Sequence, residues 1–266
     1  MDYLKLYLEF IKIKLNGIII HRSAFFWSSV SKAAVWATEF LLIWIMVKQF
    51  KSINGWSAYE VMFLYALNLT SYSFAGFFLF GLSFSLPNLI NSGEFDEVLI
   101  KPMNNFLYLV CREFNTGYFS NISISITVMV ICLLKLKISF GILSLLFFIM
   151  VILGGVLIQG AAFMFSSVPA FWIIQSSGLR FIANDFRGFI RYPVSVYNKV
   201  IQVTLTFIIP YAFISFYPSQ YFLKKNDFLM FNSYIQYLSP VVGIILFALA
   251  YRFWNIGVRH YKSSGS

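Results

Sequence analysis

Long apolar runs separated by short polar breaks dominate the sequence. A hydrocarbon core about 30 Å thick requires roughly 20 apolar residues for each helical span. The run at 145–158 is apolar on every face, unlike a membrane strand, in which apolar and polar residues alternate. The pattern therefore predicts an all-α integral membrane protein with six transmembrane helices. The spans are expected at 23–47, 59–85, 107–134, 140–166, 198–217 and 232–254.

Residues 1–22 follow a different pattern. Lys5, Glu9, Lys12 and Asn16 recur at steps of three and four, so they share a narrow stripe of a helix that is otherwise apolar. This predicts an N-terminal amphipathic helix that lies in the membrane interface. Packing against the protein's own spans would explain the same pattern equally well.

The segment 167–192 is too polar for an ordinary span. It contains Pro169 near its start and then carries Arg180, Arg187 and Arg191. We interpret it as an extension of the fourth span into the cytoplasm, followed by an interfacial helix. A re-entrant segment is the alternative interpretation.

Composition supports a membrane protein: 59% of the residues are hydrophobic and 11% are charged. The net charge is +10, and the Lys and Arg residues flank the apolar spans instead of forming a nucleic-acid patch. With both termini in the cytoplasm, about twice as many of them fall inside as outside, as the positive-inside rule requires. We therefore expect a multi-pass protein of the plasma membrane with both termini cytoplasmic and no nucleic-acid partner.

Groups that carry catalytic chemistry are scarce. The two histidines and two cysteines show no metal-ligand or disulfide spacing, and the serines lack a nearby histidine and aspartate. The chain also has no Gly-x-x-x-x-Gly-Lys-Ser/Thr segment to hold nucleotide phosphates. The sequence thus predicts no enzyme activity and no cofactor bound by this chain.

Two charged residues, Lys32 and Glu39, lie within the first predicted span. Each costs roughly 2.5 to 3.5 kcal/mol near the bilayer centre, so a functional role has to be considered. Their spacing of seven places them on one helix face. A proton or ion relay is one interpretation. We favour a pair of polar anchors that face another span, because no other span offers carboxylates to continue a relay.

The segment 210–227 is too apolar for an ordinary loop, although Pro210 and Pro218 remove two backbone donors. We expect a broken, partly re-entrant helical hairpin at the outer leaflet. Such a hairpin would shape an outer gate from Pro210, Phe213, Tyr217 and Pro218.

Acidic residues gather in one place: Glu94, Asp96 and Glu97 are three of the ten in the chain. We expect a short amphipathic helix over Ser92–Ile100, capped by Asn91 and ended by Pro102. Phe95, Val98 and Leu99 would form its apolar face. The carboxylates would be repelled by an anionic membrane surface, so we expect them to face solvent or a basic partner.

This loop carries a family resemblance. The pattern I-x-x-G-x-F-D-x-x-L-I-K-P from Ile90 to Pro102 resembles the cytoplasmic loop of permease subunits of type-two ATP-binding-cassette (ABC) exporters. The segments Tyr192–Tyr197 and Ile209–Phe213 are similar to those around the fifth span of that family. Trp254, Gly257, Arg259 and Tyr261 are similar to its usual carboxyl end.

The resemblance implies a single transmembrane permease domain over 1–266, in a transporter of two six-span permeases and two ATPase subunits on separate chains. ATP and Mg would be bound by the partner ATPase, and the second permease would be an identical or related chain. The loop 86–106 would hold a cytoplasmic coupling helix that docks on the ATPase. Its expected coupling residues are Gly93, Glu94, Phe95, Asp96, Glu97, Leu99, Lys101 and Pro102. An autonomous secondary transporter or channel is the alternative function.

Overall fold

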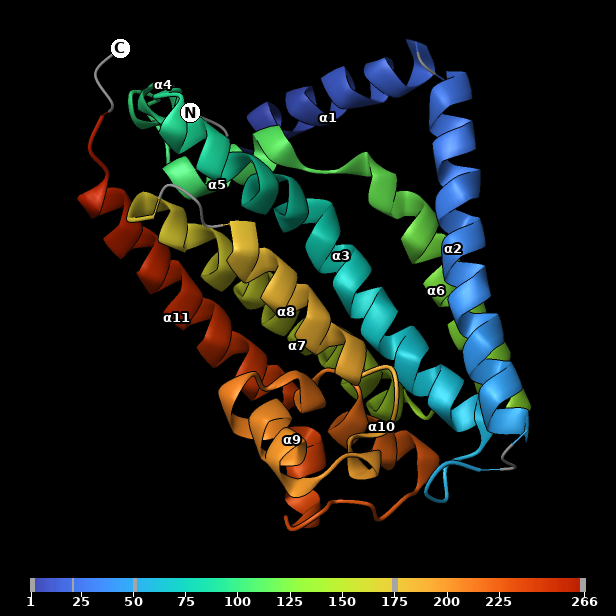
Figure 1. Ribbon diagram of the computed structural model, residues 1–266. Helices are drawn as coiled ribbons and strands as arrows, with labels where there is room; N and C mark the ends of the chain where they lie inside the picture. The colour runs from blue at the N-terminus through green and yellow to red at the C-terminus, as the bar shows by residue number, and fades with distance from the viewer. Residues whose placement is uncertain (1–2, 21, 50–51, 174–176, 264–266) are drawn as a thin grey trace.

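The computed structural model describes residues 3–20, 22–49, 52–173 and 177–263. Within these ranges the chain is helical and forms no strand. The long helices run side by side as a bundle, with shorter helices at both ends (Figure 1). This confirms the predicted all-α membrane protein.

Five helices are long and apolar enough to cross a membrane. α3 is the central one and is apolar on all sides, as expected for a helix that packs against several neighbours. α2 and α7 agree closely with the first and fourth predicted spans. The five helices are α2 (Arg22–Gln49), α3 (Ala58–Asn91), α6 (Phe119–Lys135), α7 (Ile142–Ser167) and α11 (Ser239–His260).

The third predicted span, 107–134, is interrupted. The chain forms α5 (Asn105–Glu113), a 3₁₀ turn η1 (Thr116–Tyr118) and then α6. Asn115 causes the break: its backbone N–H donates to the Phe77 carbonyl of α3 at 2.8 Å, and its side chain accepts from the Gly117 N–H at 2.9 Å. Both bonds replace helical ones, so only the part from η1 onward crosses the bundle.

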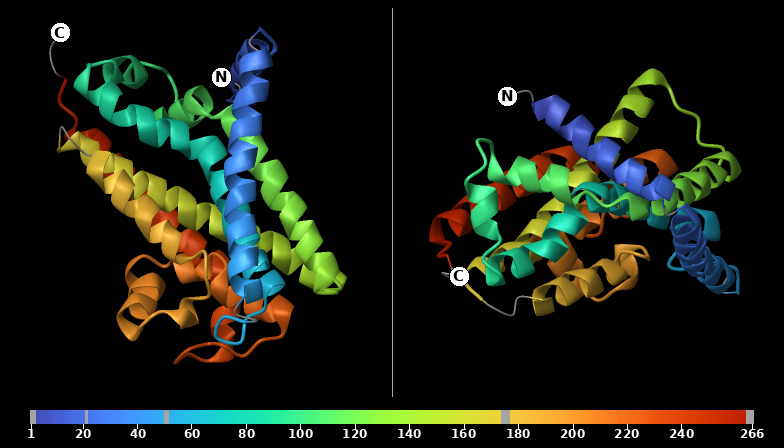
Figure 2. Two further views of the ribbon diagram at one scale, coloured as in Figure 1. Left: turned by 45° about the vertical axis from the view of Figure 1, so that its right-hand side comes forward. Right: turned by 90° about the horizontal axis from the view of Figure 1, so that it is seen from above.

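The two ends of the bundle carry different short helices (Figure 2). At one end, called the α4 end, α4 (Phe95–Leu99) and α5 lie beside α1 (Tyr3–Ile20). α1 lies across this end, and its Phe10 ring packs on Tyr108 of α5 with centroids 5.9 Å apart. The opposite end, called the α10 end, carries α9 (Lys199–Val203), α10 (Phe216–Leu223) and the 3₁₀ helix η6 (Ser233–Tyr237).

Two ring contacts show that the chain crosses the bundle once more between α7 and α11. Phe171, in the 3₁₀ turn η2 (Val168–Phe171) that follows α7, packs on Phe95 at the α4 end with centroids 5.3 Å apart. Tyr237, just before α11, packs on Phe147 at the α10 end with centroids 5.4 Å apart. The chain must therefore return from the α4 end to the α10 end between these residues.

α8 (Ser177–Phe189) makes this return, lying along α7 on the outer side of the bundle (Figures 1 and 2). The earlier arginine of α8 contacts the later part of α3, since Arg180 donates to the carbonyl of Ser83. The later one contacts an earlier part, since Arg187 lies over the ring of Tyr72. α8 is therefore antiparallel to α3.

The segment 167–192 is thus not a cytoplasmic extension with an interfacial helix, and the predicted fifth span at 198–217 is wrong in position. In the part of the chain that the structure describes, five helices have the length and apolarity of a span, and the return along the bundle between α7 and α11 is made by α8, whose polar residues hid it from the hydropathy pattern.

The predicted span 198–217 is instead a bent pair of helical segments, Lys199–Ile208 and Tyr211–Leu223, at 78° to each other. The first segment ends in the π-helix η4 (Thr204–Ile208), and Pro210 separates it from the 3₁₀ turn η5 (Tyr211–Phe213). The missing N–H of Pro210 explains why the helix does not continue. The bend lies at Pro210, and the placement of a re-entrant hairpin at the outer leaflet stays a prediction.

α7 and α11 approach each other closely through two glycines. A Cβ atom at Gly243 would lie 2.5 Å from the carbonyl oxygen of Gly154, and one at Gly154 would lie 2.7 Å from the carbonyl oxygen of Ser239. Backbone contact of this kind requires small residues, as is common between membrane helices. The two glycines therefore set the spacing of these helices.

We predict that Gly243→Val destabilises the protein by about 1–3 kcal/mol, because the added methyl groups force the two backbones apart. The free energy of unfolding is measured by heating or by titration with SDS, and circular dichroism monitors the loss of helix. Gly17→Val is the matched control, since a Cβ there meets nothing within 4 Å. Equal stability of the two variants would contradict the close packing of α7 and α11.

A second prediction tests the crossing by α8. In a background without Cys111 and Cys132, a cysteine at Val196 should react with an impermeant maleimide from the same side of the membrane as one at Gly141. A cysteine at Ile100 should react from the opposite side. Val196 and Ile100 are 44% and 78% exposed, so access to the reagent is not limiting. Labelling of positions 196 and 100 from one side would show that α8 does not cross.

Candidate functional site

The α4 turn, residues 93–102, is the first candidate site. α3 continues to Asn91, and the Ser92 N–H still donates to the Asn88 carbonyl at 2.9 Å. Gly93 then reverses the chain with a φ of +78°, a conformation that glycine adopts without strain. The predicted helix Ser92–Ile100 is therefore shorter, Phe95–Leu99, and Asn91 belongs to α3 instead of capping α4.

Phe95 attaches the α4 turn to the spans. Its side chain is 0% exposed, and its ring packs on Phe171, Trp254 and Tyr261 with centroids 5.3, 6.4 and 4.9 Å away. These partners lie at the ends of α7 and α11. Val98, one turn later, is also fully buried. The two buried side chains therefore pack the α4 turn against the ends of α7 and α11.

The carboxylates of the α4 turn have partners within the chain. Asp96 accepts a hydrogen bond from the Ser263 hydroxyl. Burial raises the pKa of the Tyr261 hydroxyl, and the Asp96 carboxylate beside it raises it further. Glu97 pairs with Lys101 at 3.2 Å and with Arg112 at 4.0 Å. Asp96 thus holds the carboxyl-terminal segment, whereas Glu97 remains half exposed at the edge of the turn.

The free surface of the α4 turn is mixed. Leu99 and Ile100 are exposed, in contrast to the prediction that Leu99 shares one buried face with Phe95 and Val98. Glu94 and Pro102 are exposed as well, whereas Gly93 and Lys101 are half buried. The turn therefore presents two apolar side chains flanked by carboxylates at the end of the bundle.

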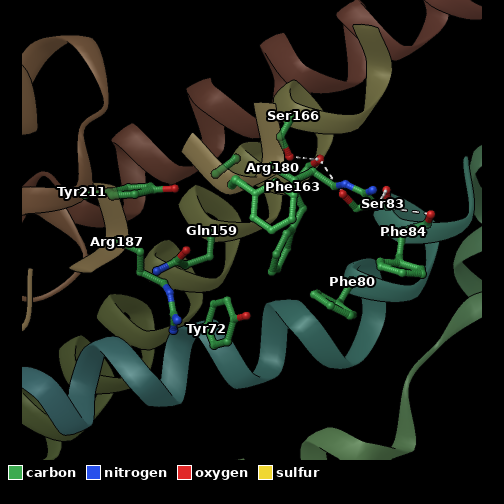
Figure 3. A pocket seen from close by; sticks show the side chains of 12 residues that line it. Tyr72, Phe80, Ser83, Phe84, Gln159, Phe163, Ser166, Arg180, Arg187 and Tyr211 are labelled. Atoms are coloured by element: carbon green, nitrogen blue, oxygen red, sulfur yellow. Dashed lines mark hydrogen bonds between the residues drawn. The ribbon is translucent and has the colours of Figure 1, made fainter. Parts of the chain in front are cut away.

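A cavity of about 220 Å³ between α3, α7 and α8 is the second candidate site (Figure 3). Aromatic side chains form much of its wall, and polar groups from all three helices point into it. None of the lining residues is acidic. The lining consists of Tyr72, Phe80, Ser83, Phe84, Gln159, Ala162, Phe163, Ser166, Arg180, Phe181, Arg187 and Tyr211.

Arg180 donates to a carbonyl group of α3 that has no helical hydrogen bond. Pro87 lies inside this helix and has no N–H, so the Ser83 carbonyl loses its helical donor. Arg180 supplies the missing donor: its Nη1 lies 3.1 Å from the Ser83 oxygen and 3.3 Å from that of Phe84. This bonding allows α3 to pass Pro87 and end at Asn91 instead of at the predicted residue 85.

Arg187 lies deeper along α8, over aromatic rings. Its guanidinium carbon is 3.8 Å from the ring centroid of Tyr72 and 5.7 Å from that of Trp36 on α2. The hydroxyl of Tyr118 donates to that of Tyr72 at 3.2 Å, which fixes the ring beneath the guanidinium. Cation–π contact of this kind offsets part of the cost of desolvating the arginine.

Lys32 and Glu39 both contact other elements of this chain. The Lys32 ammonium donates to the Gly117 carbonyl of η1 at 3.3 Å. Glu39 pairs with Arg191 at 3.2 Å and accepts a hydrogen bond from Tyr65 of α3. These contacts agree with polar anchors that face neighbouring helices. They tie the otherwise exposed α2 to the bundle.

The expected outer-gate residues lie at the α10 end. Phe213, Tyr217 and Pro218 are buried in the core, and the Tyr217 hydroxyl lies 2.9 Å from that of Thr206. Pro210 lines a second, apolar cavity of about 410 Å³ that shares Ala162, Ser166 and Tyr211 with the first. The indole N–H of Trp56 donates to the Asp227 carboxylate at 2.9 Å and so ties the end of the hairpin to the segment before α3.

Sequence reasoning missed both cavity arginines as site residues because it placed 167–192 outside the membrane. One signal was present: Arg180 and Arg187 are seven residues apart and therefore share one face of an amphipathic helix. Among the described residues, no three His, Cys, Asp or Glu side chains lie close enough together to hold a metal ion.

Comparisons with known proteins bear on the whole arrangement. A family model described as ABC-2 family transporter protein matches residues 33–265, which include the α4 turn, both cavities and the bent hairpin. No match was found among curated proteins or solved structures. The chain belongs to the ABC-2 family of transporter proteins and is thereby a membrane permease component of an ABC transporter.

Proposed function

We propose that this chain is the membrane-spanning subunit of an ATP-driven exporter, and that it couples to an ATPase carried on a separate chain. ATP and Mg bind to that partner, and this chain supplies the translocation path. The observation that carries the proposal is the α4 turn, whose buried Phe95 contacts the ends of α7 and α11 while its other side is exposed. A force applied to the turn would be transmitted to two spans.

The exposed surface of the α4 turn fits a protein partner better than a lipid surface. Leu99 and Ile100 offer apolar contact area, and the flanking Glu94 and Glu97 would be repelled by anionic headgroups. The resemblance of this loop to permease coupling loops supports an ATPase as the partner. Asp96 is assigned a different role, because it holds Ser263 within the chain.

The α4 end is proposed to face the cytoplasm, which places both termini there, since Figure 1 shows N and C at this end. Lys101, Arg112, Arg252 and Arg259 also lie toward it. The charge bias is smaller than the sequence alone indicated, because Arg180, Arg187 and Arg191 belong to the crossing by α8 or its end. The plasma membrane is the proposed location.

A second permease, identical or related, would complete the path. α2 leaves a large apolar face exposed, including Val35, Leu41 and Leu42, and Phe181 and Ile182 are exposed beside the cavity on α8. A partner covering α2 and α8 would enclose the cavity that one chain leaves open. Lys32 and Glu39 need no such partner, since both contact their own chain.

We predict that Ile100→Glu lowers the affinity for the ATPase subunit at least tenfold and reduces export in proportion, because it places a charge at the centre of the apolar contact. Co-purification of the ATPase at a series of concentrations measures the affinity. Met230→Glu is the matched control, since Met230 is similarly exposed, at the α10 end. Its ATPase capture should be unchanged.

Two results would overturn the proposal. One is normal ATPase capture and export by Ile100→Glu. The other is transport by the purified chain alone, driven by an ion gradient, which would favour the autonomous secondary transporter.

A further inference from the structure

Residues 261–263, which follow α11 and are called the tail segment below, contact the α4 turn twice. The Tyr261 ring packs on Phe95 of the turn and on Phe171, with centroids 4.9 and 6.3 Å away. Two residues later, the Ser263 hydroxyl donates to the Asp96 carboxylate at 2.5 Å. Figure 1 shows the tail segment as the red trace that leaves α11 and runs toward α4. It therefore makes one apolar and one polar contact with two consecutive residues of the turn.

The α4 turn depends on contacts of this kind because its own helix is short. The helix Phe95–Leu99 has five residues, whereas an isolated helix shorter than roughly 12–15 residues is only marginally stable. Gly93, just before it, is the residue type that restricts the backbone least. The orientation of the turn is therefore set by its neighbours in the fold and not by its own hydrogen bonds.

These neighbours hold the α4 turn on different sides. Phe95 and Val98 are buried against the spans, and Glu97 pairs with Arg112 of α5 at 4.0 Å. Asp96 and Glu97 are consecutive, so their side chains point roughly 100° apart on the helix. Asp96 bonds to the tail segment and not to α5. Without this bond, the side of the turn that carries Asp96 would lose its polar attachment.

The tail segment also connects the turn to a span through the backbone, because it continues α11. α11 in turn packs against α7 where Gly243 meets the backbone of Gly154. A displacement of the turn would therefore reach α11 by two routes, through the ring contacts of Phe95 and through the bond of Asp96 to Ser263.

We propose that the tail segment positions the α4 turn for the ATPase, and that Asp96 and Ser263 are positioning residues for coupling. Their bond holds the exposed Leu99 and Ile100 in the orientation in which the partner meets them. Neither Asp96 nor Ser263 has to touch the ATPase. This role rests on the proposed exporter function and adds a second attachment to the same docking surface.

A direct contact between Asp96 and the ATPase is the alternative, and the structure favours it less. Asp96 is half buried and its carboxylate already accepts from Ser263, whereas Glu94 and Glu97 are exposed on the same turn. A cation of the partner would have to displace the serine before it reached Asp96. The two roles differ in one requirement, because only positioning depends on the hydroxyl of Ser263.

The first test measures the orientation of the turn without the ATPase. A nitroxide is attached to a cysteine at position 99 of the full-length chain, in a background free of native cysteines, and electron paramagnetic resonance in nanodiscs measures its mobility. Ser263→Ala should shorten the rotational correlation time of the label about twofold, because the turn gains nanosecond motion. Ser263→Thr should keep the native spectrum, since the hydroxyl remains.

Ser233→Ala is the matched control for this measurement. Ser233 is exposed like Ser263 and also donates to a side-chain oxygen, that of Asn232 at 3.2 Å, but it lies at the α10 end. Its loss should leave the spectrum of the label at position 99 unchanged. A general loosening of the protein by removal of a serine would affect both variants.

The second test measures ATPase capture by co-purification at a series of ATPase concentrations. Ser263→Ala should lower the affinity by about threefold to tenfold, the loss expected for one partly exposed hydrogen bond. Asp96→Ala should lower it at least as much. The double variant should bind no worse than Asp96→Ala alone, because both changes break the same bond. If Asp96 touched the ATPase directly, the two losses would add.

A native spectrum of the label in Ser263→Ala would overturn the proposal, as would additive losses in the double variant. Ile100→Glu distinguishes this failure from failure of the exporter function, since it changes the docking surface itself. Loss of ATPase capture in Ile100→Glu together with native capture in Ser263→Ala rejects the positioning role only. Native capture by Ile100→Glu rejects the coupling function and, with it, any role of the tail segment in coupling.

Discussion

The return of the chain as α8 is the constraint on which the rest of the bundle depends. α7 ends at the α4 end and α11 begins at the α10 end, so the segment that connects them has to run back along the bundle. That segment is polar. Backbone and charged groups inside a membrane must find partners within the protein. Arg180 donates to carbonyl groups of α3, and Arg187 lies over the ring of Tyr72, which is also on α3. The polar face of α8 is therefore turned inward, and the cavity forms where this face meets α3 and α7.

The α4 turn solves a different physical problem, the transfer of force between a soluble partner and the bundle. An exposed loop that only rested on the bundle would deform when pushed. Phe95 prevents this because its ring lies among aromatic side chains at the ends of α7 and α11, and Trp254 is itself held by a bond from its indole N–H to Asn105 at 3.1 Å. The turn is thus part of the bundle's core and moves with it.

Hydropathy alone located α2 and α7, because their apolar runs are long and uninterrupted. It failed for α8, whose arginines and short length resemble those of an interfacial helix until its neighbours are known. It also failed where one side chain redirects the backbone, as Asn115 does between α5 and α6. The α4 turn was found by its motif, but whether Asp96 faces a partner or Ser263 depends on where the carboxyl terminus lies. Such long-range contacts leave no local pattern.

Pro87 links two positions that are far apart in the sequence. Any residue other than proline at 87 would restore an N–H and give the Ser83 carbonyl a helical partner, so Arg180 would no longer be required there. Conversely, loss of Arg180 would leave an unsatisfied carbonyl within the bundle as long as Pro87 remains. Among relatives the two residues are therefore expected to be exchanged together, so that aligned sequences could reveal the neighbourhood of α3 and α8 without a structure.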